Sequence, residues 1–148
     1  MYDEYLSKAL SDLIVARQAI DTYKTNTKLK DMKNMASYHI QQAIEKVLKY
    51  SIYNSQSQNG NKIQELYTHN LDLLIKNYCV KYGITVPKKI VKNAKEYTRW
   101  EAESRYSLNY SIRIDSIVSA MIETEDWLVS LKPSYKSNVA HFRSKYKV

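Results

Sequence analysis

Four basic residues stand at helical spacing between positions 88 and 99. Lys88, Lys92, Lys95 and Arg99 follow one another at intervals of four, three and four residues, with Lys89 close by. A helix through this segment places the four along one face, over about 16 Å. Such a row of cations suits the phosphate backbone of a nucleic acid. The alternative is the ordinary solvated face of an amphipathic helix.

The net charge of the chain favours the same class of ligand. The 148 residues include 23 Lys and Arg against 15 Asp and Glu, which gives a net charge of +8. This balance favours nucleic acid, nucleotide or acidic protein partners, although it also serves solubility alone. The chain has only two glycines, so it cannot build a glycine-rich phosphate loop.

Residues that bind metals or form disulfides are sparse. The histidines His39, His69 and His141 are far apart, and none has a second histidine or a carboxylate at metal-ligand spacing. We therefore predict no metal site and no cofactor. Cys79 is the only cysteine, so no intrachain disulfide can form and a reducing compartment fits.

A second set of polar residues lies on a long amphipathic helix expected over residues 31–53. Apolar residues recur there at steps of three and four, and no Gly or Pro interrupts the segment. An amphipathic helix requires the apolar stripe but not the particular polar residues beside it, which are His39, Gln42, Glu45, Lys46 and Lys49.

These residues carry a family resemblance. The run Gln-Gln-Ala-x-Glu-Lys-x-Leu-Lys over positions 41–49 resembles the second helix of the HEPN domain family, a nucleotide-binding helical module of higher eukaryotes and prokaryotes. His39 precedes it, one place nearer the glutamines than in the family pattern. The dipeptide His69-Asn70 before Leu71 is similar to the family's His-Asp/Asn-Leu at the start of the next helix.

Catalytic HEPN members are metal-independent ribonucleases that carry an Arg followed four to six residues later by a His. No histidine stands at that distance after Arg99, Arg105 or Arg113. The nearest variant is Arg105 with Tyr110, and a tyrosine with an ordinary pKa near 10 is a poor acid–base catalyst at neutral pH. Arg105 is alternatively a phosphate ligand or an ion-pair partner of a nearby carboxylate. The missing histidine favours a non-catalytic protein.

The resemblance also implies partners. Bacterial HEPN proteins of this size often act as dimers beside a minimal nucleotidyltransferase, in toxin–antitoxin or related systems. We therefore expect nucleotide or RNA binding, a homodimer and a nucleotidyltransferase partner, and the 14 tyrosines suit an interface. Two alternatives stay open: a ribonuclease toxin with a degenerate Arg…Tyr motif, and a module that only binds another protein.

The expected architecture is all-α, an up-and-down antiparallel bundle of four to five helices over residues 1–131. Helices are expected at 3–24, with Asp12 and Arg17 off the apolar stripe, and at 31–53, with Asp31 as N-cap. Further helices are expected from about 62 or 66 to 82 with Tyr67 on the buried face, from about 88 to 99 or slightly past, and from about 109–111 to Pro133. Residues 132–148 are expected to form a basic tail, partly ordered or as a short helix. No segment has the length of a membrane span and none resembles a signal peptide, so we predict a cytoplasmic protein.

Overall fold

The computed structural model of the protein describes residues 2–106 and 111–148, apart from the side chains of residues 105 and 106. Within these residues there are six α-helices and no strand, so the all-α prediction is confirmed. The helices are α1 (Asp3–Thr25), α2 (Lys30–Gln58), α3 (Leu71–Leu74), α4 (Lys88–Tyr106), α5 (Ile114–Leu131) and α6 (Lys136–Lys145). A π-helical turn (Ile75–Cys79) continues α3, and a 3-10 turn (Pro133–Tyr135) precedes α6.

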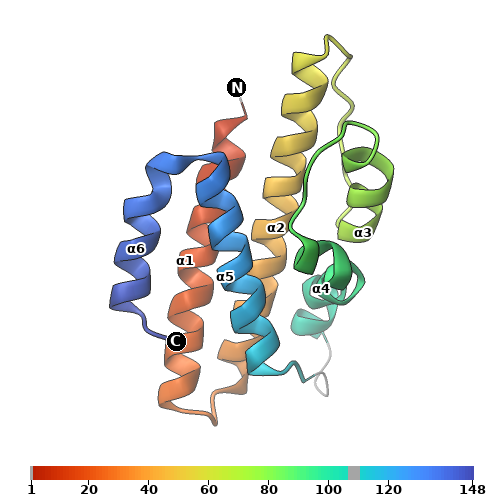
Figure 1. The fold of residues 1–148 in the computed structure, drawn as a ribbon. Coiled ribbons are helices and arrows are strands. Elements are labelled where there is room, and N and C mark those ends of the chain that lie inside the picture. The colour runs from red at the N-terminus through yellow and green to blue at the C-terminus, as the bar shows by residue number, and fades with distance from the viewer. Residues whose placement is uncertain (1, 107–110) are drawn as a thin grey trace.

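Helix α2 is the central element of the bundle. It packs against α1, α4 and α5, and α1 runs antiparallel to it (Figure 1). Its apolar stripe is fully buried, because side chains at steps of three and four face one side of a helix. The stripe comprises Ala36, Ile40, Ala43, Ile44, Val47, Leu48 and Ile52. Burial of this surface is the main driving force for the fold.

Both ends of α2 differ from the expected boundaries. The helix begins at Lys30 with Leu29 at the cap position, so Asp31 lies in the first turn and the N-cap assignment is wrong. At the other end α2 continues through Gln58. Gln56 is buried there, and its amide accepts from the backbone N–H of Gln64 and donates to the hydroxyl of Tyr82. These tertiary contacts override the weak helix propensity of this segment.

The third helix is shorter than expected. Residues 62–70 are not helical, and α3 begins only at Leu71, where the Asn70 side chain caps the helix by accepting from the N–H of Leu73 at 3.1 Å. Tyr67, expected on the buried face, is 82% exposed. The backbone N–H of Leu66 instead donates to the hydroxyl of Tyr53 at 2.9 Å, and this bond holds the segment as a loop over α2.

The fourth helix extends further than expected and the fifth starts later. Helix α4 continues to Tyr106 because Trp100 is fully buried and packs on Tyr97, with 4.6 Å between the ring centroids. Helix α5 begins at Ile114. In the C-terminal tail, residues Lys136–Lys145 form α6, which lies beside α1 and α5 and runs antiparallel to α5 (Figure 1). No helix in the described part of the chain is long and apolar enough to cross a membrane.

Candidate functional site

Asp12 of α1 binds two of the polar motif residues of α2. The Asp12 carboxylate lies 2.8 Å from His39 Nδ1, and Lys46 Nζ forms an ion pair with its other oxygen. The Asp12 side chain is only 12% exposed. From the sequence, His39 is expected to hydrogen-bond within the bundle, with the loop that leads into His69 as one candidate partner. The imidazole does bind within the bundle, and its partner is Asp12 on the neighbouring helix rather than that loop.

Glu45 gathers a second polar cluster on the other side of α2. One carboxylate oxygen lies 3.1 Å from Lys49 Nζ, and the other lies 2.9 Å from His69 Nδ1 and 3.2 Å from Gln41 Nε2. Gln42 donates to the side-chain oxygen of Gln41 at 2.7 Å. The Glu45 side chain is 8% exposed, so both of its oxygens are used inside the protein. A buried carboxylate of this kind must be paired to be tolerated.

The structure thus divides the motif residues between two clusters instead of forming one site. His39 and Lys46 belong to Asp12, whereas Gln42, Lys49 and His69 belong to the Glu45 cluster. In each cluster the ionised groups meet partners within the fold. These contacts hold α1, α2 and the loop before α3 together. Because His39 Nδ1 contacts Asp12, the opposite edge of the imidazole ring is directed away from Asp12.

The basic residues of α4 lie where the spacing placed them, on the outside of the bundle. Lys88, Lys89, Lys92 and Lys95 are exposed, and none forms an ion pair with a described residue. Arg99 differs, because its guanidinium contacts Glu103 at 3.1 Å and Glu96 at 3.3 Å. The last cation of the row is therefore compensated locally, which the spacing of the basic residues alone did not reveal.

The two weak catalytic candidates cannot be placed. The side chain of Arg105 and the whole of Tyr110 lie outside the described residues. Their assignment stays a prediction, as does the pairing of Arg105 with a carboxylate. Among the residues that the structure describes, no group of three or more His, Cys, Asp and Glu is arranged to hold a metal ion.

The family model of the HEPN domain matches residues 2–126. The chain belongs to the HEPN domain family. The resemblance read from the second helix is therefore confirmed. No match to the chain was found among curated proteins or among solved structures. The HEPN match ends within α5, so α6 lies beyond it.

Sequence reasoning missed the charged residues that organise this HEPN domain. Asp12 and Arg17 were placed outside the buried stripe of α1, yet they are 9% and 3% exposed. Arg17 pairs with Glu125 of α5, and Asp12 pairs with α2. Both sit next to small or apolar positions of the stripe, such as Leu13 and Ala16. That adjacency was the available signal, because a charged residue at the edge of a buried stripe requires a partner.

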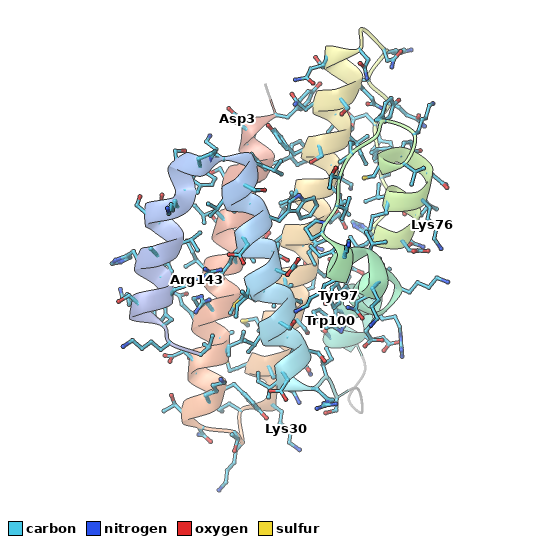
Figure 2. The ribbon with its side chains drawn as sticks, viewed as in Figure 1. Asp3, Lys30, Lys76, Tyr97, Trp100 and Arg143 are labelled. Carbon is cyan, nitrogen blue, oxygen red and sulfur yellow. The ribbon has the colours of Figure 1, made fainter. Side chains whose placement is uncertain are left out.

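Two open clefts flank the end of α4 in the HEPN domain. One, of about 480 Å³, lies between α4 and the start of α5 and is lined by Tyr97 and Trp100, whose positions Figure 2 marks. Burial raises the pKa of Tyr97 there, and the indole N–H of Trp100 has no hydrogen-bond partner among the described residues. The other cleft, of about 450 Å³, lies along the first half of α2.

Proposed function

We propose that this HEPN protein binds the phosphates of RNA or of a nucleotide through the exposed lysines of α4, and that it does so without catalysis. The observation that carries the proposal is the uncompensated charge of Lys88, Lys89, Lys92 and Lys95. Nine Lys and Arg side chains form ion pairs among the described residues, most of them on other helices. These four lysines have no acidic partner in the same part of the chain.

The place of these lysines on the helix supports the proposal. The N-terminal end of a helix carries about half a positive charge from its aligned peptide dipoles, and acidic residues usually compensate it. The first turn of α4 has no acidic residue and begins with Lys88 and Lys89. Positive potential is therefore concentrated at this end of α4, and a phosphate placed there would be stabilised by the lysines and by the helix.

The absence of an Arg…His pair supports binding without cleavage. A ribonuclease with the degenerate pair Arg105 and Tyr110 is the second candidate activity, and a module that only binds another protein is the third. A homodimer and a nucleotidyltransferase partner belong to the same proposal. Light scattering at micromolar concentration tests the dimer, and co-purification with a nucleotidyltransferase encoded beside this chain tests the second partner.

The α4 proposal is tested by fluorescence anisotropy with a labelled single-stranded RNA at several salt concentrations. Replacing Lys92 and Lys95 by Gln should weaken binding of all sequences alike and flatten the salt slope by about 0.7 for each phosphate that is no longer neutralised. The matched control is Lys62→Gln/Lys136→Gln, which removes the same charge from two exposed lysines elsewhere. Equal affinities and equal salt slopes for the two double variants would mean that the α4 lysines form an ordinary solvated surface and do not bind RNA.

A further inference from the structure

The cleft along α2 is built from one face of that helix. Its α2 residues follow at intervals of three, one, three and one, which places them side by side, and α4 supplies the opposite wall. Its volume of about 450 Å³ falls in the range of small-molecule sites, roughly 300–1,000 Å³. The lining residues are Asp31, Asn34, Met35, Tyr38, His39 and Ser104.

Hydrogen-bond acceptors dominate the polar groups of this cleft. The Asp31 carboxylate is exposed and forms no ion pair with a described residue. Asn34 Oδ1 is buried and has no hydrogen-bond partner among the described residues. Because a carboxylate only accepts, the contact with Asp12 places a hydrogen on His39 Nδ1, so Nε2 is an acceptor whenever the ring carries a single proton. These acceptors suit a ligand with several N–H donors.

The rest of the lining suits a flat ring. Met35 lines the cleft and is 45% exposed, so its side chain offers apolar surface to the face of a ring. Tyr38 stands beside it, with its ring edge-on to His39 and 5.2 Å between the centroids. A planar guanidinium cation would also donate several N–H groups. The net charge of +8 and the exposed Lys30 next to Asp31 disfavour a cation and favour a ligand that carries phosphate.

The geometry points to this cleft as a binding site for the guanine base of a nucleotide. The N1–H and the 2-amino group of guanine donate in parallel to the two oxygens of Asp31, and the face of the base packs on Tyr38 and Met35. Asn34 Oδ1 and His39 Nε2 are further acceptors for the amino group. This site is distinct from the one in the proposed function. Ser104 lies on the side of α4 that contacts Ser37 of α2, whereas the α4 lysines are exposed to solvent.

Isothermal titration of the full chain with GMP, IMP and AMP tests the assignment. GMP should bind most tightly, IMP less tightly because it lacks the 2-amino group, and AMP least because it also lacks N1–H. Asp31→Asn should weaken GMP binding by roughly tenfold to a hundredfold, the range for a bidentate contact to a base, and should leave ribose 5-phosphate binding unchanged. The control Asp115→Asn removes another exposed carboxylate from the first turn of a helix and should leave the preference intact.

Equal binding of GMP and AMP by the wild type, or an unchanged preference in Asp31→Asn, would overturn the guanine site. The two proposals fail separately. The variant Lys92→Gln/Lys95→Gln should keep the preference for GMP while it loses affinity for RNA. If RNA binding proves insensitive to those lysines and the GMP preference persists, the α4 proposal alone is wrong. If RNA binding depends on them and no base is preferred, the guanine site alone is wrong.

Discussion

Arg17 and Glu125, 108 residues apart in the sequence, form a bidentate ion pair inside the helical bundle. Arg17 Nε and Nη2 donate to the two carboxylate oxygens at 2.9 and 2.8 Å, and both side chains are 4% exposed. Arg143 of α6 donates to the same carboxylate at 3.0 Å, and Arg17 Nη1 donates to the carbonyl of Tyr146 at 2.9 Å. Glu125 therefore joins α1, α5 and α6. Arg143, its partner on α6, is labelled in Figure 2.

Removing the charge of Glu125 should destabilise the fold. Glu125→Gln leaves the buried guanidinium of Arg17 without its counter-ion, and breaking one side of a buried pair costs about 3–5 kcal/mol. Urea denaturation measures this loss as a lower free energy of unfolding. The control is Glu4→Gln, which breaks the exposed pair with Lys8 and should leave the melting temperature unchanged. A Glu125→Gln protein as stable as the wild type would contradict the structural role of the pair.

A charged residue on the buried face of α2 should destabilise the fold even more. Ile44 is fully buried at the centre of the bundle. Ile44→Asp places an unpaired carboxylate there, at a cost of several kcal/mol out of a total stability of about 5–15 kcal/mol. The variant should be unfolded or marginally stable by circular dichroism. Ile122→Asp on α5, where the isoleucine is 39% exposed, is the matched control and should melt close to the wild type.

The thiol of Cys79 predicts a pH dependence of stability. Burial raises the pKa of Cys79 from 9.0 to about 12. Between pH 9 and 12 the unfolded chain loses the thiol proton while the native protein keeps it. The native state then binds more protons, so the free energy of unfolding falls as pH rises, by up to about 1.4 kcal/mol per pH unit.

Urea denaturation at about pH 8 and about pH 10 measures this effect, with Cys79→Ala as the reference. Both proteins share every other titrating group, so the difference between their losses of stability isolates the thiol. The wild type should lose about 1.4 kcal/mol more than the variant over this interval. Parallel losses in the two proteins would mean that the thiol ionises as readily in the native state as in the unfolded chain.

The helices of the bundle were largely predictable because their apolar periodicity is local. The stripe of α2 and the exposed row of lysines on α4 follow directly from spacing. Element ends were not predictable where distant contacts decide them. Gln56 extends α2 through its hydrogen bonds to Gln64 and Tyr82. Both partners lie outside the helix, so the local sequence of α2 does not reveal these contacts.

The polar clusters were harder to predict than the helices for the same reason. The motif residues of α2 were identified, but their partners were not, since Asp12 lies 27 residues from His39 in the sequence. Helical spacing places a side chain on one face of its own helix and does not identify the neighbour across the interface. The cleft beside His39 also needed the packing of α4 on α2 before it could be seen.

The final prediction concerns catalysis. No histidine follows any of Arg99, Arg105 or Arg113 at the four- to six-residue spacing of HEPN ribonucleases, so the chain lacks the usual acid–base group for phosphodiester cleavage. We expect no more than background cleavage of a generic single-stranded RNA incubated for several hours with a metal chelator. Gel electrophoresis of samples taken over that time measures the cleavage. Strong cleavage that disappears in both Arg105→Ala and Tyr110→Phe would instead support the ribonuclease toxin. Cleavage that survives both substitutions would indicate a contaminating nuclease, because the chain then retains no candidate pair at that position.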